Sequence, residues 1–296
     1  MKTYKLYTAI LMLISASVFA SVSRNEKNAL LDLYTYTNGD NWNVKWDFNQ
    51  PVSTWYGVTV VDDKIVSINL ASNNLVGIIP NSIQDLKYLE SFNVFKNKLK
   101  GQFPSELFRI QTLKNINISF NSFTGHLPES ISLATNLVTL EMFMNQFSGD
   151  LPENIGALKN LELLSLFNNN FTGKLPQGIY QLKNLKELAI QSNFFIGEIS
   201  NEVVNMSNLE ILSLFDNQFS GKIPTVEQMP KLTAMNLSLN KFEDFNDFSL
   251  MELKSYKTQL AINTKKEQNT LATNEVVIEK NKDIKSNSVT LTTIKE

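Results

Sequence analysis

The chain has 296 residues, a formal net charge of −2 and a hydrophobic share of 43%, which is enough to build a globular core. The absence of cysteine excludes disulfides, a thiol nucleophile and a cysteine-based metal site, and the presence of one histidine, His126, excludes a histidine cluster. The small net charge gives no indication of binding to nucleic acid or to an anionic membrane.

The N-terminus, residues 1–20, has the pattern of a secretory signal peptide. Two lysines precede a mostly apolar run from Leu6 to Phe19, and small residues allow cleavage after Ala20. This run has about 14 residues, whereas a membrane-spanning helix needs roughly 20, so a cleaved signal is favoured over a transmembrane anchor. We therefore expect a secreted or extracellular protein, with a periplasmic or cell-surface location as the alternative.

An asparagine recurs at a fixed interval through most of the chain. The interval is 24 residues up to Asn217 and 23 for the last step, which places the series at Asn73, Asn97, Asn121, Asn145, Asn169, Asn193, Asn217 and Asn240. Aligned on these asparagines, residues 65–245 contain eight copies of the template L-x-x-L-x-L-x-x-N-x-L-x-G-x-I-P, such as "LELLSLFNNNFTGKLP" at 161–176. A self-similar period of this length is typical of a solenoid.

Each part of the template predicts a local structure. The L-x-L centre alternates and predicts a short strand with one face buried. In the copy at 161–176, Leu164 and Leu166 should point inward, whereas Ser165 and Phe167 should point outward. The asparagine ends the strand, and a buried amide can satisfy the backbone groups that lose their partners there, because it donates and accepts at once. We therefore expect an asparagine ladder, followed by a glycine bend and, after proline, one helical or 3-10 turn on the outer side.

Both open ends of such a stack need covering, because each exposes apolar side chains. At the N-terminal end, residues 21–64 supply a predicted cap with Ala29, Leu30, Leu33, Tyr34, Trp42, Trp46 and Trp55. At the other end, residues 246–262 predict a closing helix, because apolar residues fall near helical spacing at Leu250, Leu253, Tyr256 and Leu260. The Lys-, Asn- and Thr-rich residues 263–296 are predicted to be a disordered tail.

The 24-residue copies with N-x-L-x-G-x-I-P resemble plant-type leucine-rich repeats, which occur in plant receptor-kinase ectodomains, in polygalacturonase-inhibiting proteins and in similar exported bacterial proteins. The segments "NALLDLYTYTNGDNW" and "STWYGVTVVDDKIVSINL" resemble the N-terminal cap of that family, so the likeness covers about residues 25–245. Plant caps usually carry paired cysteines, and their absence here favours the cysteine-free bacterial type. The resemblance implies an α/β solenoid: a curved, right-handed leucine-rich-repeat coil with a parallel β-sheet on its concave face and short helical or 3-10 turns on its convex face.

The positions one and two residues before each ladder asparagine should face the concave side, where solenoids bind large ligands. Phenylalanine is frequent at these positions, and clustered exposed aromatics commonly mark a contact site. The alternative is that each ring lies flat on its neighbours and only seals the sheet. Together with flanking polar residues, the predicted ligand-binding set is Phe95, Lys96, Asn117, Phe120, Glu141, Phe143, Met144, Phe167, Asn168, Phe215 and Asp216.

These features favour an exported, non-enzymatic recognition protein that binds a protein, a peptide or a glycan on its concave surface. The resemblance adds a second hypothesis, an inhibitor of a secreted polysaccharide hydrolase, and a third is a structural or adhesive component of the cell surface. We expect no enzymatic activity, since the sequence contains no nucleophile elbow, phosphate-binding loop or metalloprotease motif. We likewise expect no cofactor, no metal site, no nucleic-acid partner and no stable membrane anchor in the mature chain. The sequence leaves the oligomeric state open.

Overall fold

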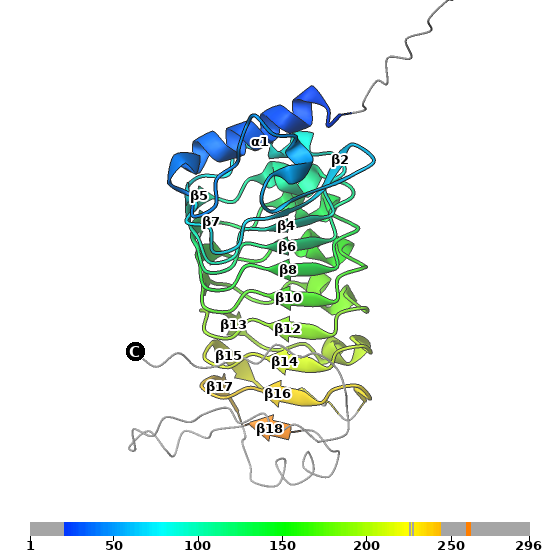
Figure 1. The fold of residues 1–296 in the computed structure, drawn as a ribbon. Helices are drawn as coiled ribbons and strands as arrows, with labels where there is room; N and C mark the ends of the chain where they lie inside the picture. The colour runs from blue at the N-terminus through cyan, green and yellow to red at the C-terminus, as the bar shows by residue number, and fades with distance from the viewer. Residues whose placement is uncertain (1–20, 225, 227, 244–258, 262–296) are drawn as a thin grey trace, which may run out of the picture.

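The computed structural model describes residues 21–224, 226, 228–243 and 259–261 (Figure 1). The predicted signal peptide, most of the predicted closing helix and the predicted tail fall outside these residues. Figure 1 shows an N-terminal helix above a column of stacked turns, with the strands of successive turns lying side by side. This arrangement confirms the predicted α/β solenoid.

One long sheet connects all the repeats. Among the described residues it has ten strands, in the order β1-β2-β4-β6-β8-β10-β12-β14-β16-β18. Their bounds are β1 (Val58–Val61), β2 (Lys64–Asn69), β4 (Ser91–Asn93), β6 (Asn115–Asn117), β8 (Thr139–Glu141), β10 (Leu163–Ser165), β12 (Glu187–Ala189), β14 (Ile211–Ser213), β16 (Ala234–Asn236) and β18 (Gln259–Ala261). β1 pairs antiparallel with β2, and the later pairs are parallel, so that Leu140, Leu164 and Leu188 lie side by side. We call the solvent-facing side of this sheet the concave face.

A second set of short strands, which was not expected from the sequence, follows the ladder asparagines. In the described residues these strands are β3 (Val76–Gly77), β5 (Lys98–Gln102), β7 (Ser122–Gly125), β9 (Gln146–Gly149) and β11 (Asn170–Phe171) in one sheet, and β13 (Ile196–Gly197), β15 (Gln218–Gly221) and β17 (Lys241–Phe242) in another. In β9 the side chain of Phe147 is buried while Gln146 is exposed, which is the alternation of a strand with one covered face. We call the outer surface of these two sheets the lateral face; its strands lie beside the concave sheet in Figure 1.

Six repeats return through a five-residue 3-10 helix on the side opposite the concave sheet. Within the described ranges these are η3 (Asn81–Asp85), η4 (Ser105–Arg109), η5 (Glu129–Leu133), η6 (Glu153–Ala157), η7 (Gln177–Gln181) and η8 (Asn201–Asn205). The first five follow a proline, which fixes φ at the entry to the turn. η8 follows Ser200 instead, and the Ser200 Oγ accepts a hydrogen bond from the Glu202 N–H at 3.2 Å. A side-chain cap thus takes the place of the proline, and the turn keeps its length.

Aligned columns of apolar side chains fill the interior. The strand leucines, such as Leu164 and Leu166, are fully buried. The phenylalanines of the lateral strands form a second column, in which neighbouring ring centroids lie 6.0 to 6.4 Å apart from Phe123 through Phe147, Phe171, Phe195 and Phe219 to Phe242. Because every repeat places the same side chain at the same height, each column is continuous from one repeat to the next.

The N-terminal end of the stack is covered by α1 (Arg24–Tyr36) and by the tryptophan-rich segment that contains η1 (Gly39–Asn41) and η2 (Val52–Thr54). Leu33 of α1 is fully buried, and Trp46 stacks on Trp55 with ring centroids 4.9 Å apart. The Glu26 carboxylate accepts a hydrogen bond from the Ile65 N–H at 3.1 Å, which joins the helix to β2. Apolar burial and this hydrogen bond together hold the cap on the first repeat.

The C-terminal end differs from the expectation in the part that the structure describes. A closing helix was predicted for residues 246–262, but Gln259–Ala261 form β18 and pair in parallel with β16, with Leu260 beside Met235. The physical reason is that β16 would otherwise present unpaired backbone N–H and C=O groups at the edge of the sheet. β18 satisfies these groups. The spacing of apolar residues in the segment does not reveal this requirement, because it arises from the exposed edge of the sheet.

Candidate binding site on the concave face

The asparagine ladder lies under the edge of the concave face. In a typical copy, the Asn145 Nδ2 donates to the carbonyl oxygens of Ile118 and Met142 at 3.1 Å and of Phe143 at 3.3 Å. The Asn145 Oδ1 accepts a hydrogen bond from the Phe123 N–H of the preceding repeat at 3.0 Å. The amide therefore joins two repeats, and its donors are used within the fold.

The same pattern of bonds recurs through the ladder. It is found at Asn97, Asn121, Asn169, Asn193, Asn217 and Asn240. Asn73 begins the series and instead contacts the cap, where its Oδ1 accepts from the Val44 N–H at 2.7 Å and its Nδ2 donates to the Val44 carbonyl at 3.1 Å. The ladder is thus a structural element that also fixes the cap.

Four phenylalanines form a continuous aromatic strip along the concave face: Phe95, Phe120, Phe143 and Phe167. Phe143 and Phe167 stack face to face, with ring centroids 4.3 Å apart and planes 10° apart. Phe120 contacts Phe95 at 5.3 Å and Phe143 at 5.6 Å, in both cases edge to face. The rings therefore seal against one another, as one hypothesis predicted, yet all four remain partly accessible and Phe120 is 36% exposed.

A small residue explains why the strip is continuous. Ser119 stands where the neighbouring repeats have Phe95 and Phe143, and its short side chain leaves a space. The ring of Phe120, the next residue, contacts both of these phenylalanines, and Ser119 is fully buried. Phe215, in contrast, has no ring partner among the described residues, because Gln191 occupies the equivalent position in the repeat between Phe215 and Phe167.

The residue before each ladder asparagine has a left-handed backbone conformation, which the sequence analysis missed. The φ angles lie between 52° and 55° at Ser72, Lys96, Phe120, Met144, Asn168, Ser192, Asp216 and Leu239. Asparagine, aspartate and glycine tolerate this conformation best, whereas in most other residues Cβ crowds the backbone at a cost of about 1–2 kcal/mol. Asn168 and Asp216 are the only weak sequence signal, since serine, lysine or apolar residues occupy the same position in the other repeats.

Two of the strained positions carry large apolar side chains beside the aromatic strip. Phe120 is 36% exposed and Met144 is 37% exposed. The other predicted residues of this row, Lys96, Asn168 and Asp216, are exposed at the edge where the concave face meets the lateral face. The structure thus brings Lys96 and Met144 to the edge of the aromatic strip, to which Phe120 itself belongs, but leaves Phe215 outside the strip.

Polar side chains lie on the strands next to the strip. The Asn117 Nδ2 donates to the Glu141 Oε2 at 2.6 Å, across neighbouring strands. Burial, and secondarily the charge of Glu187, raises the pKa of the Glu141 carboxyl. Burial also raises the pKa of Glu187. The concave face therefore holds two half-buried carboxyl groups whose charged forms are unfavourable in the unliganded protein.

One expected outward residue is covered. Ser165 was predicted to face solvent but is only 5% exposed. It lies in the ladder of strands between Glu141 and Ala189, and its side chain is too short to reach past the residues around it. Ser165 therefore does not contribute to the accessible polar row, although Ser213 at the same repeat position is partly accessible.

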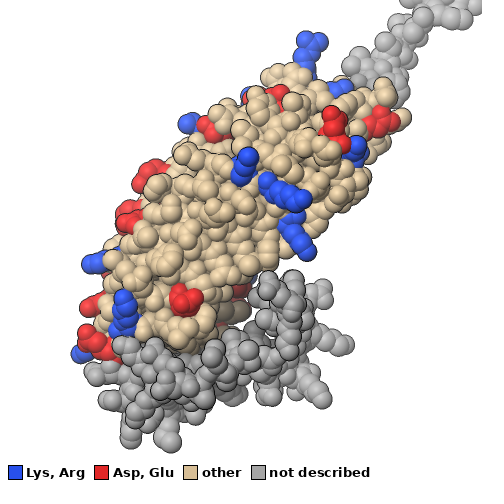
Figure 2. Space-filling view, turned by 90° about the vertical axis from the view of Figure 1, so that its left-hand side faces the viewer, with Lys and Arg blue, Asp and Glu red and all other residues tan. Residues whose placement is uncertain are grey.

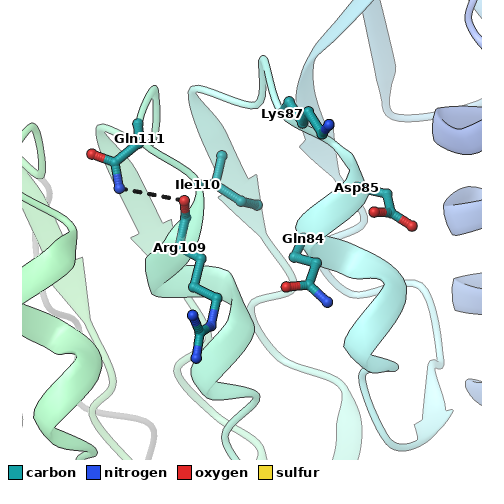
Figure 3. A pocket seen from close by; sticks show the side chains of 6 residues that line it. All are labelled: Gln84, Asp85, Lys87, Arg109, Ile110 and Gln111. Atoms are coloured by element: carbon teal, nitrogen blue, oxygen red, sulfur yellow. Dashed lines mark hydrogen bonds between the residues drawn. The ribbon is translucent and has the colours of Figure 1, made fainter.

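A separate cavity of about 360 Å³ lies on the convex side, between η3 and η4 (Figure 3). Its lining residues are Gln84, Asp85, Lys87, Arg109, Ile110 and Gln111. Gln84, Lys87, Arg109 and Gln111 are exposed, whereas pockets for small molecules enclose most of the ligand. The described ranges contain no cluster of three potential metal-ligating side chains and no helix long and apolar enough to cross a bilayer.

Comparison with known proteins supports the fold. A model of the Leucine Rich Repeat family matches residues 64–86, 112–133, 160–182 and 208–226. The ectodomain of the Arabidopsis receptor kinase HAESA, solved with an IDA peptide hormone ligand, is 34% identical with a TM-score of 0.60, over 65% of this chain and 32% of that one. The PEPR1–AtPEP1 complex is 26% identical with a TM-score of 0.66, over 73% of this chain and 35% of that one.

A third solved structure shares the fold at lower identity. The leucine-rich-repeat ectodomain of the Arabidopsis thaliana membrane receptor kinase GASSHO1/SCHENGEN3 is 24% identical with a TM-score of 0.69, over 80% of this chain and 29% of that one. The chain thus spans about a third of the length of these relatives. No curated protein sequence matched it. The chain therefore contains leucine-rich repeats and folds as a cysteine-free leucine-rich-repeat solenoid that is similar to plant receptor-kinase ectodomains.

Proposed function

We propose that this protein is an exported recognition protein that binds an extended peptide segment on its concave face, through the aromatic strip and the adjoining Met144. The observation that carries the proposal is the strip itself, in which partly exposed rings are joined into one apolar surface. Export is supported by the signal-like residues 1–20, and a binding role by the likeness to receptor ectodomains.

Backbone strain supports a role for this surface beyond folding. Phe120 and Met144 hold large apolar side chains in the left-handed region, where asparagine would be more stable. Both side chains are also more than a third exposed to water. Because the left-handed φ recurs in every repeat, the sign of function is not the strain alone but the presence there of large, exposed apolar side chains in place of a better-suited asparagine.

The arrangement of the rings favours a peptide over a glycan. Sugar rings bind to the open faces of aromatic side chains, but Phe143 and Phe167 each cover one face of the other, and Phe120 and Phe143 are in edge-to-face contact. These contacts reduce the open ring-face area, and the strip together with the Met144 thioether suits aliphatic and aromatic side chains. Asn117 and Glu141, on the strands beside the strip, could hydrogen-bond to a peptide backbone.

Selection from a random peptide library displayed on phage tests the proposal. Peptides selected on the wild-type protein should bind the double variant Phe143→Ser/Phe167→Ser at least tenfold more weakly, as expected for central aromatic contacts. The control variant Leu133→Ser/Phe194→Ser removes comparable exposed apolar groups outside the strip and should bind normally. Circular dichroism and the thermal unfolding midpoint show whether each variant is folded.

A single change guards against loss of the fold. Phe120→Asn removes the central ring of the strip while suiting the left-handed backbone, so it should stay folded and still lose binding. Unchanged affinity of both folded strip variants would overturn the proposal. Inhibition of a secreted polysaccharide hydrolase that does not depend on the strip would favour the inhibitor hypothesis. Preferential binding of neutral oligosaccharides would favour a glycan as the ligand.

A further inference from the structure

Three lysines lie together where the concave face meets the lateral face, in the second repeat. Lys96 directly precedes ladder residue Asn97, and Lys98 and Lys100 are alternate residues of β5 on either side of the buried Leu99. All three lysines are exposed. Figure 2 looks onto this side of the molecule and shows a group of basic side chains on an otherwise mostly uncharged surface. We call these three residues the lysine patch.

The charge of the lysine patch is not neutralised within the part of the chain that the structure describes. The two ion pairs found there involve other lysines. The cross-strand neighbours of β5 are uncharged, since Val76 lies beside Lys98 and Ser122 lies beside Lys100. Three ammonium groups therefore repel one another on a small area, which is unfavourable unless an anion lies among them.

The fold itself does not call for lysine at these positions. In the fourth repeat the residues equivalent to Lys98 and Lys100 are Gln146 and Ser148, and they form the same kind of lateral strand. Both strands alternate around a buried apolar residue that belongs to the interior column. The lysines thus add a local positive charge to a surface that forms equally well with neutral side chains.

The lysine patch is continuous with the aromatic strip. Lys96 follows Phe95 in the chain, and the Phe95 ring contacts Phe120 at 5.3 Å. We infer that the lysine patch binds carboxylate groups of the peptide whose apolar side chains occupy the aromatic strip; this inference rests on the proposed function. The recognised segment is therefore an acidic peptide with neighbouring apolar residues, and the patch fixes which end of it lies at the second repeat.

The spacing of the lysines suits a peptide. Alternate residues of a strand lie about 6 to 7 Å apart on one face, and alternate side chains of an extended peptide have the same spacing. A peptide that turns from the aromatic strip to run along β5 can therefore place two acidic residues, separated by one position, opposite Lys98 and Lys100, with complementary charge. Because the patch adjoins an apolar strip, a ligand with both carboxylates and apolar side chains fits the combined surface better than an acidic polysaccharide.

The test compares peptides selected from the random phage library on three proteins: the wild type, the variant Lys96→Gln/Lys98→Gln/Lys100→Gln, and the control Lys87→Gln/Lys159→Gln/Lys183→Gln. The control also removes three positive charges, from exposed lysines that occupy a different but mutually equivalent position in three repeats. Selection on the wild type and on the control should enrich aspartate and glutamate, and selection on the patch variant should not. A selected acidic peptide should bind the patch variant about tenfold more weakly, given three exposed ion pairs.

The salt dependence and a neutral peptide complete the test. Replacing glutamate by glutamine in the selected peptide should weaken binding to the wild type but not to the patch variant, and added salt should mimic this change. Equal enrichment of acidic residues on both proteins, or lysine-dependent binding of uronic-acid oligosaccharides in place of acidic peptides, would overturn the inference. The glutamine-substituted peptide separates the two proposals. If the folded strip variants lose binding of this peptide and the patch variant keeps it, the proposed function stands. If the strip variants also keep it, the proposed function is overturned.

Discussion

Replacing one ladder asparagine by alanine should destabilise the protein by an amount that the hydrogen bonds allow us to work out. In Asn145→Ala the Phe123 N–H loses the Asn145 Oδ1, which is its partner at 3.0 Å in the buried interior. Three carbonyl oxygens also lose a donor. The backbone itself is unchanged, so the effect isolates what the amide contributes to joining two repeats.

The carbonyl oxygens are less affected than the N–H. The Ile118 carbonyl still accepts from the Asn121 Nδ2, and the Met142 carbonyl still accepts from the Asn169 Nδ2, both at 3.0 Å. The main cost is therefore one buried unsatisfied N–H, about 1 to 3 kcal/mol, to which the lost carbonyl bonds add roughly 1 kcal/mol. We expect a loss of about 2 to 4 kcal/mol, a large fraction of the ~5 to 15 kcal/mol that stabilises a typical domain.

The isosteric Asn145→Asp change sharpens this prediction. Aspartate keeps an acceptor for the Phe123 N–H but places a carboxylate oxygen against three carbonyl oxygens, so at neutral pH it should destabilise more than alanine does. The excess should shrink at low pH, where a protonated aspartate can donate. Gln146→Ala, a change in the adjacent exposed residue, is the matched control and should cost less than about 0.5 kcal/mol.

Urea denaturation followed by far-ultraviolet circular dichroism measures these differences. Tryptophan fluorescence alone is insufficient, because Trp42, Trp46 and Trp55 all lie in the N-terminal cap and report only that end. An Asn145→Ala protein as stable as the Gln146→Ala control would refute the reasoning. An aspartate variant that is more stable than the alanine variant at neutral pH would refute it equally.

Two further predictions concern the concave face. Met144→Asn should raise the free energy of unfolding in urea by about 1 kcal/mol, because asparagine suits the left-handed backbone, and should weaken peptide binding. Glu187→Gln should stabilise the protein at neutral pH, measured by thermal unfolding. Because burial raises the pKa of Glu187 above its ordinary value of 4.5, the folded state binds more protons than the unfolded state, and wild-type stability falls as pH rises from that value through the raised pKa.

Each of these two changes has a control. Asn168→Met introduces methionine at the equivalent position of the next repeat and should destabilise by a similar amount; an effect of the same sign as Met144→Asn would contradict the strain argument. Glu129→Gln removes an exposed carboxylate and should leave the pH dependence of stability as in the wild type. If Glu187→Gln also left the pH dependence of stability unchanged, burial of the Glu187 carboxylate would not contribute to that pH dependence.

Much of the fold could be predicted because a repeat restates the same physical requirement many times. A strand with one buried face needs leucine at alternate positions, and a strand end needs buried amides such as Asn145 and Asn169, so both recur with the period. Any one copy would be ambiguous. The aromatic strip was predicted for the same reason, since Phe143 and Phe167 stand at one repeat position.

The tertiary structure decided the features that depend on contacts between copies. Phe120 joins the strip only because Ser119 leaves a space between rings of two other repeats, and Ser165, at an outward strand position, is covered once the repeats pack together. The left-handed conformation at Met144 is imposed by the path of the chain and not by its own preference. Sequence alone therefore determined the solenoid and its interior, where every copy has the same surroundings, while the binding surface was decided by side chains that differ from one copy to the next and meet only across strands.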